Sequence, residues 1–268
     1  MTLSLRLPYL RTLRGTAMAI AAAAVCATAS AALPQFTFNP LAGGITGAPA
    51  STITADNILI SDYSTVMIDA AGNFTDTGFL AVSSFQLGGS TFTPAGLNST
   101  YGLYFSFTAR GTQSVGNPAV VPTFGTFSSL SYTLFGYNGT GTFGFSGNTP
   151  TVTTTGAQTV LASGTLISGS VSSIPTGDGS TFNPSANARV NWTVIDNPFF
   201  ASPIPFYSRA ETSFTNTSGQ VESFPGGFRI RQGGGSVNFI SAIPEPGTYG
   251  LLLSGLAAVG FIARRRRG

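Results

Sequence analysis

The chain has 268 residues, contains no histidine and no lysine, and has one cysteine, Cys26. This composition excludes Ser-His-Asp and Cys-His nucleophiles, Schiff-base lysines, and zinc sites built on imidazole or thiolate. The formal net charge is +3, but seven of the twelve arginines lie before residue 15 or after residue 263, and the other five are outnumbered by nine acidic residues, which leaves −4 for residues 33–263. Because binding to a phosphate backbone needs a basic surface, we expect no nucleic-acid partner.

Residues 1–32 have the layout of a secretory signal peptide. Three arginines precede an alanine-rich apolar run at 16–25, and small residues follow at 29–32. A basic segment, an apolar segment and a small-residue site in this order are typical substrates of signal peptidase. We expect cleavage near Ala32, which removes Cys26 and leaves the mature chain without a thiol.

Residues 33–243 have the composition and periodicity of an antiparallel β domain. Phe, Thr, Val and Tyr, which suit half-buried pleated strands, are abundant there, whereas the helix formers Glu and Lys are scarce or absent. Apolar and polar residues alternate most clearly in the segments 101–110, 129–134, 190–194 and 228–239. We predict an all-β fold of about ten antiparallel strands in one β-sandwich, with helices only in the two terminal segments.

Glycine and proline positions predict how the strands are connected. The segment 228–239 has three consecutive glycines, Gly233 to Gly235, at its centre and is predicted to be a closing hairpin. The polar stretch 147–156 is either a loop or an edge strand whose threonines discourage pairing with another chain.

Two aromatic residues are assigned to opposite environments. Trp192 lies in the alternating segment 190–194, so we expect it in the core. Tyr104 shares its strand face with small or polar residues such as Ser106 and Thr108. We therefore predict that Tyr104 is exposed, and it is the candidate residue for stacking against a sugar ring.

Four acidic residues, Asp56, Asp62, Asp69 and Asp76, lie close together in the sequence. Asp69 and Asp76, with Asn73 between them, offer oxygens for calcium, but the spacing does not match the twelve-residue calcium loop, and turns are the alternative that we favour. Paired carboxylates are the remaining route to catalysis, as in glycosidases, but no pair lies in a recognisable motif. We expect no metal site, no cofactor and no catalytic residue.

The C-terminal segment is a tail of three parts. In chain order these are the motif Pro244, Glu245, Pro246 and Gly247, the uncharged apolar stretch 248–263, and the cluster Arg264, Arg265, Arg266 and Arg267. The prolines keep the backbone of the motif extended, and the arginines hold the end of the chain in the cytoplasm by the positive-inside rule. The apolar stretch is shorter than the about twenty residues of a comfortable membrane span, so we expect a transient transmembrane helix.

This tail resembles the PEP-CTERM sorting signal of Gram-negative bacteria, with the Pro-Glu-Pro of that family on Pro244, Glu245 and Pro246. The resemblance implies processing by an exosortase, a membrane-embedded cysteine protease, which releases the exported protein or anchors it anew. It further implies an intermediate in the inner membrane and a final position at the outer surface or in the extracellular matrix. An ordinary C-terminal membrane anchor is the alternative.

Several short segments of the body carry a second resemblance. They are 54–57, Tyr63 with Val66, 69–74, 101–104, 197–200, 205–207 and 233–239. These segments are similar to the flocculation-associated PEP-CTERM proteins of floc-forming bacteria, which implies a role in cell aggregation within exopolysaccharide, in flocs or biofilm, and brings no catalytic residue. We therefore predict a non-catalytic exported surface or matrix protein. The alternative is a secreted polysaccharide-binding lectin or a carboxylate-dependent glycoside hydrolase on the same scaffold.

Overall fold

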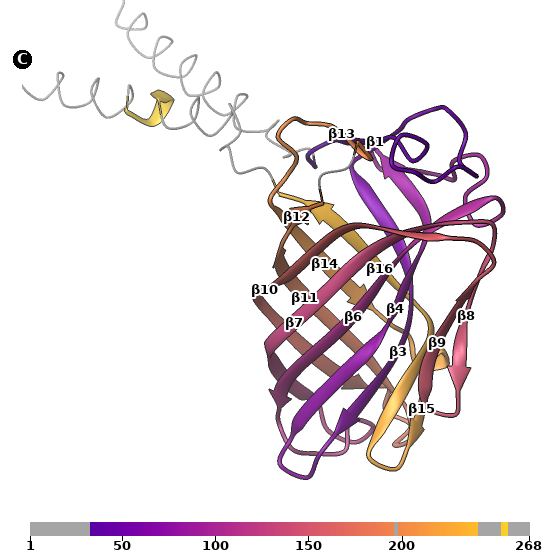
Figure 1. Cartoon of the computed structure of the whole chain (residues 1–268). Coiled ribbons are helices and arrows are strands. Elements are labelled where there is room, and N and C mark those ends of the chain that lie inside the picture. The colour runs from indigo at the N-terminus through magenta and orange to yellow at the C-terminus, as the bar shows by residue number, and fades with distance from the viewer. Residues whose placement is uncertain (1–32, 196–197, 241–252, 257–268) are drawn as a thin grey trace, which may run out of the picture. The chain divides into compact units, whose positions relative to one another are not determined.

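The computed structural model describes residues 33–195, 198–240 and 253–256 (Figure 1). Leu33–Ala242 form one compact unit, and its described residues hold sixteen strands and a single short 3-10 helix, η1 (Ser218–Gln220). The predicted β-rich body is therefore confirmed. The predicted signal peptide and most of the C-terminal tail lie outside the described residues.

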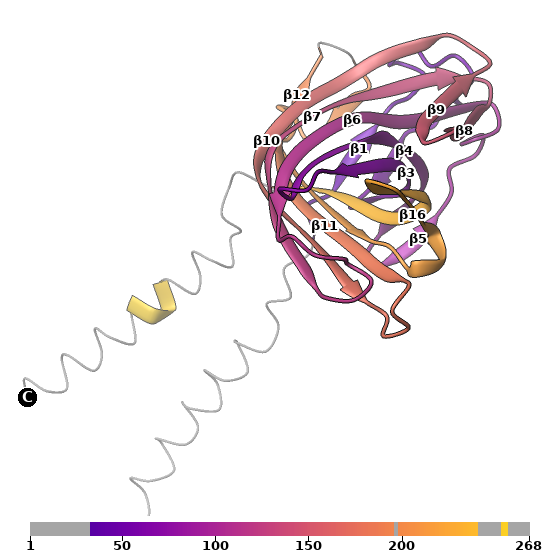
Figure 2. The same ribbon diagram turned by 90° about the horizontal axis from the view of Figure 1, so that it is seen from below.

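Eight long strands form a closed antiparallel barrel. In order of pairing they are β11 (Phe182–Asn191), β14 (Arg209–Thr215), β16 (Gly227–Phe239), β3 (Asn57–Ile68), β4 (Asn73–Leu87), β6 (Tyr101–Gln113), β7 (Thr123–Asn138) and β10 (Gln158–Pro175). Strand β10 pairs with β7 on one side and with β11 on the other, from Leu166 opposite Val190 to Pro175 opposite Phe182, and this second pairing closes the sheet. Figure 2 shows these strands from below, curving around a common interior.

The predicted β-sandwich is wrong because strand periodicity does not distinguish a sandwich from a barrel. Alternation of apolar and polar residues shows only that one face of each strand is buried. In a sandwich a second sheet buries that face, and in a barrel the opposite wall of the same sheet buries it. The alternation itself is confirmed on β6, where Leu103, Phe105 and Ala109 are all buried.

The remaining strands are short and extend or cover the barrel. Strands β1 (Phe36–Phe38), β2 (Ile53–Ala55) and β13 (Phe200–Ser202) form a separate sheet at one end, drawn at the top of Figure 1. Strands β8 (Gly141–Ser146) and β9 (Thr149–Thr154) form a hairpin outside the barrel wall. Strands β5 (Ser90–Phe92), β12 (Thr193–Val194) and β15 (Val221–Phe224) pair with β4, β10 and β16.

Aromatic side chains fill the barrel end that carries β1, β2 and β13. The ring of Phe38 lies 4.6 Å from Phe199 and 5.4 Å from Phe200, measured between ring centroids. Trp192 is 4% exposed and meets Phe239 edge to face at 4.7 Å, which confirms its predicted place in the core. Such aromatic pairs add about 0.5–1.5 kcal/mol each beyond the burial of their surface.

The predicted closing hairpin at residues 228–239 is wrong, because β16 continues through the three glycines as a single strand. A β-bulge lies between Arg231 and Gly233 instead of a turn. The glycines permit close packing: a Cβ on Gly233 would lie 2.2 Å from Asn216 Oδ1, and a Cβ on Gly235 would lie 2.6 Å from a ring carbon of Phe214. The nearby turn is instead the one between β15 and β16, where Gly226 has φ = 84°.

The predicted exposure of Tyr104 is also wrong, since this side chain is 3% exposed. Tyr104 points outward from β6, but the β8–β9 hairpin covers it, with Phe143 at 5.7 Å between ring centroids. Its ring stacks on Phe135 at 5.0 Å, and its hydroxyl donates a 2.6 Å hydrogen bond to Gln158 Oε1. Of the two alternatives for the polar stretch 147–156, the strand is therefore confirmed as β9, and this strand belongs to the covering hairpin.

Both aromatic residues should therefore contribute to stability. We expect Trp192→Ala to lower the free energy of unfolding by about 3–5 kcal/mol, because a large buried ring is removed. Tyr104→Ala should be destabilising for the same reason, whereas Tyr104→Phe keeps the ring and should cost only about 1 kcal/mol for the lost hydrogen bond. Chemical denaturation of the three variants measures these differences. A Tyr104→Ala variant as stable as the parent would contradict the packing described for the hairpin.

Candidate functional site

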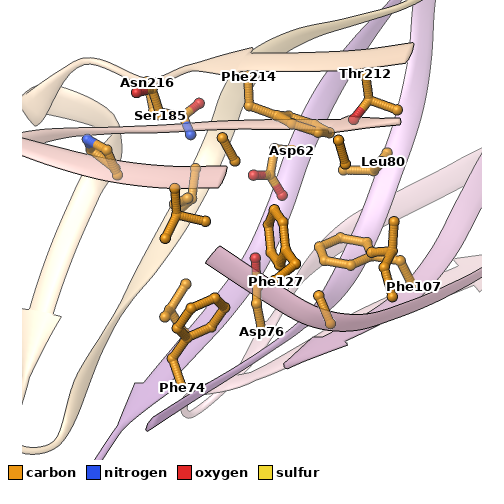
Figure 3. Close-up of a pocket in the computed structure, with 18 of the residues that line it drawn as sticks. Asp62, Phe74, Asp76, Leu80, Phe107, Phe127, Ser185, Thr212, Phe214 and Asn216 are labelled. Carbon is orange, nitrogen blue, oxygen red and sulfur yellow. The ribbon is translucent and has the colours of Figure 1, made fainter. Parts of the chain in front are cut away.

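A cavity of about 90 Å³ lies inside the barrel (Figure 3). All eight barrel strands contribute side chains to its wall. The wall is rich in aromatic rings, among them Phe74, Phe107, Phe127 and Phe214. An apolar cavity of about 150 Å³ accommodates benzene, so this cavity is too small for a sugar ring with its hydroxyl groups.

Two carboxyl groups face this apolar cavity from neighbouring strands. Asp62 on β3 is 4% exposed, and Figure 3 shows it and Asp76 of β4 pointing into the same space. In the register of the two strands, Asp62 lies opposite Leu80, and Asp76 lies opposite Val66. Alternation along β3 explains why the Asp62 side chain points inward. Asp62 and Val66 are four residues apart, so both side chains lie on the buried face of the strand.

A serine and a glycine separate the two carboxyl groups along the strands. Ser64 lies opposite Gly78, and a Cβ on Gly78 would come within 2.5 Å of the Ser64 Cβ atom, so only glycine fits there. Ser64 hydrogen-bonds to both carboxyl groups, whereas, among the described residues, the Oδ1 atoms of Asp62 and Asp76 have no hydrogen-bond partner. Buried polar atoms without partners are costly in folded proteins, and each one requires an explanation.

Burial controls the protonation of this pair. Desolvation raises the pKa of Asp62 to about 7. It raises the pKa of Asp76 well above its ordinary value, with a further contribution from the negative charge of Asp62. Tyr132 is the other titratable residue of the wall, burial raises its pKa, and its hydroxyl donates a 2.8 Å hydrogen bond to the carbonyl oxygen of Asn191. Among the described residues, no arginine lines the cavity to balance the carboxyl groups.

The outer face of the barrel has a different chemistry. Small uncharged polar side chains lie side by side across neighbouring strands in two sets, which we call the hydroxyl rows. The longer row is Thr112, Thr126, Ser170, Asn187 and Ser213, and the shorter row is Thr108, Ser131 and Thr165. All eight side chains are exposed.

Charged residues lie near the hydroxyl rows but not within them. Arg110 lies between the rows on β6, and Arg189 and Glu211 form an exposed ion pair on β11 and β14. Because adjacent strands are about 4.7–4.9 Å apart, five neighbouring positions give the longer row a length of roughly 19 Å. This arrangement offers repeated hydrogen-bond donors and acceptors along one line.

The acidic residues considered for calcium separate into different environments. Asp69 is exposed and accepts 2.9 Å hydrogen bonds from the backbone N–H groups of Ala71 and Asn73, which confirms the turn interpretation. Asp56 accepts a 2.6 Å hydrogen bond from the N–H of Gly88. Within residues 33–195, 198–240 and 253–256, no group of three or more His, Cys, Asp or Glu side chains is placed to hold a metal ion.

The pairing of Asp62 with Asp76 was missed in the sequence, although a signal was present. Residues Ile58, Ile60, Asp62, Ser64 and Val66 alternate with outward-facing neighbours, so the acid occupies an inward position of a buried strand. That pattern identifies Asp62 as buried, but only the register of β3 and β4 places Asp76 near it, on the far side of the Ser64–Gly78 pair.

Other predicted site residues fall elsewhere. Tyr104 lies beneath the β8–β9 hairpin and apart from the cavity wall and the hydroxyl rows. The motif Pro244 to Gly247 and the cluster Arg264 to Arg267 lie outside the described residues, as does most of the predicted membrane stretch 248–263. In the part of the chain that the structure describes, no helix is both long enough and apolar enough to span a membrane.

Comparison with known proteins identifies the tail. Residues 242–267 match the family model of the PEP-CTERM protein-sorting motif, a range that includes Glu245 and the four arginines. No curated protein and no solved structure matches the chain. The motif implies processing by an exosortase and export to the cell surface.

The buried carboxyl groups should make stability depend on pH. Because the folded state keeps Asp62 protonated where the unfolded chain ionises it, the free energy of unfolding should fall as pH rises from about 4 to 7, by roughly 1.4 kcal/mol per unit for each such group. Asp62→Asn cannot ionise, so we expect a shallower slope and a more stable protein at pH 8. Denaturation across this pH range measures both effects. The exposed Asp178→Asn is the control, and an unchanged slope in Asp62→Asn would contradict the assignment.

The sorting motif should act through its acidic residue. We expect Glu245→Ala to leave export across the inner membrane intact while unprocessed protein accumulates in the membrane, because the signal peptide acts earlier and independently. Immunoblotting of membrane and extracellular fractions detects the difference. Normal processing of Glu245→Ala would reduce the motif to an extended spacer.

Proposed function

We propose that this protein is a non-catalytic component of the cell surface or extracellular matrix that associates with exopolysaccharide and supports cell aggregation in flocs or biofilm. The observation that carries the proposal is the pair of hydroxyl rows on the outer face of β6, β7, β10, β11 and β14. The sorting motif supports it, since export brings this face into contact with surface polysaccharide.

The chemistry of the rows suits a polysaccharide. Hydroxyl and amide side chains both donate and accept hydrogen bonds, as the hydroxyl groups of a sugar chain do. Because the rows themselves carry no charge, a neutral or acidic chain approaches them without strong repulsion, and several weak hydrogen bonds in one line add up to useful affinity. The body has few charged residues overall, so this mode of binding depends little on salt.

Closure of the barrel restricts how the protein joins cells together. An open sheet edge promotes association by strand addition, and closure of the main sheet removes that route for its eight strands. Aggregation would then proceed through side-chain surfaces that bind a shared polymer. The closed barrel therefore supports a role as a matrix component more than it supports self-assembly into fibres.

The alternatives receive less support from the geometry. A carboxylate-dependent glycoside hydrolase needs two acids beside a bound sugar, but Asp62 and Asp76 face a cavity of about 90 Å³. A lectin that relies on stacking by Tyr104 would need the β8–β9 hairpin to move, because Phe143 packs against that ring. Hydrogen bonding along the exposed rows needs no rearrangement.

Removal of three row hydroxyls tests the proposal. We expect the triple variant Thr112→Val, Thr126→Val and Ser170→Ala to bind isolated exopolysaccharide about tenfold or more weakly, since each lost hydrogen bond costs about 0.5–1.5 kcal/mol. Its thermal midpoint should stay near that of the parent, because the three side chains are exposed. Co-sedimentation with the polysaccharide and an aggregation assay of complemented cells provide the measurements.

The matched control removes three exposed strand hydroxyls elsewhere. Thr142→Val, Thr153→Val and Ser223→Ala delete the same chemical groups from β8, β9 and β15. Equal loss of binding in both triple variants would show that the effect is not specific to the rows. Full binding by the row variant would overturn the proposed surface.

A further inference from the structure

The described wall of the cavity inside the barrel has carboxyl acceptors but no arginine. Asp62 and Asp76 each present an unpartnered Oδ1 atom to apolar surroundings. A further side chain is an independent sign of an absent partner: Asn216 is 2% exposed and has an unpartnered Oδ1 atom in the cavity wall. A hydrogen-bond donor in the cavity would satisfy the oxygens that the described protein leaves unpaired.

The wall indicates what charge that donor carries. Aromatic faces from several strands surround the carboxyl pair, and Phe74, Phe107 and Phe127 are drawn around it in Figure 3. Aromatic faces attract cations, and a carboxylate pairs most strongly with a cation that also donates hydrogen bonds. An ammonium group meets both requirements.

The lining and the size of the cavity argue against calcium and against large organic cations. Calcium takes six to eight oxygen ligands, whereas the wall around Asp62 and Asp76 is mostly apolar. A cavity of about 90 Å³, compared with about 150 Å³ for one that holds benzene, admits about four non-hydrogen atoms. These properties fit a primary ammonium ion with a short apolar chain.

We propose that the barrel interior is a binding site for a small primary alkylammonium ion, whose ammonium group is held by Asp62 and Asp76 and whose carbon chain packs against the aromatic wall. This activity is independent of polysaccharide binding, because it uses the inner face of the barrel and the hydroxyl rows lie on the outer face. It gives the exported protein a second ligand class, short-chain amines.

The chain contains its own reporter for this site. Trp192 is the one tryptophan of the sequence, and it lines the cavity. We expect n-propylammonium chloride to change the fluorescence of Trp192 in a saturable manner at pH 8, with a dissociation constant in the high-micromolar to millimolar range set by the small number of ligand atoms. The neutral isostere 1-propanol, with the same number of non-hydrogen atoms, should produce no saturable change at the same concentrations.

Substitution of the carboxyl groups tests their role. We expect Asp62→Asn and Asp76→Asn to weaken n-propylammonium binding by about tenfold to a hundredfold, as the loss of a charged hydrogen bond does, and the surface variant Asp178→Asn to bind like the parent. Asparagine is close in shape and removes a buried charge, so both variants should fold, and their circular dichroism and thermal midpoints verify this.

The pH dependence gives a second, independent readout. The titratable residues of the wall are Asp62 on β3, Asp76 on β4 and Tyr132 on β7. At pH 5 the Asp62 carboxyl group is protonated in the folded protein, so binding should be weaker than at pH 8 in the parent, and this difference between the two pH values should be smaller in Asp62→Asn. Absence of a saturable signal, equal binding of 1-propanol, or parental affinity in both folded variants would overturn the proposal.

Discussion

The pairing of β10 with β11 closes the sheet, and the other features of this body depend on that closure. Once the sheet is closed, alternate residues of all eight strands face one enclosed interior, and their neighbours face outward. The inner set packs as two apolar clusters, and the outer set gives the hydroxyl rows. Closure also excludes solvent from the carboxyl groups of Asp62 and Asp76, which would be ordinary surface acids on an open sheet.

Aromatic packing extends the buried region beyond the barrel interior. At one end, the short sheet of β1, β2 and β13 brings Phe38 against Phe199 and Phe200. On the outer wall, the β8–β9 hairpin covers Tyr104, while Thr65 donates a 2.6 Å hydrogen bond to the carbonyl oxygen of Asn148 at the hairpin tip. The hairpin therefore removes the aromatic surface of Tyr104 from solvent.

Sorting and binding are assigned to separate parts of the chain. The sorting motif at 242–267 implies processing by an exosortase. The body offers two chemically distinct surfaces, an uncharged polar outer face and an acidic, aromatic interior. Side chains of the two surfaces alternate along the same strands. A substitution on one surface therefore leaves the side chains of the other surface unchanged. The two proposed ligands, a sugar chain and a small amine, are therefore separable by experiment.

The sequence by itself determined the sorting tail, the β-rich body, the buried position of Trp192 and most strand faces. These follow from local order and period-two alternation, which the printed residues carry directly. Tertiary structure alone decided the barrel in place of a sandwich, because closure depends on the long-range pairing of β10 with β11. It likewise decided that a downstream hairpin buries Tyr104 and that Asp62 and Asp76 share a cavity, since alternation specifies the face of a side chain but not what lies opposite it.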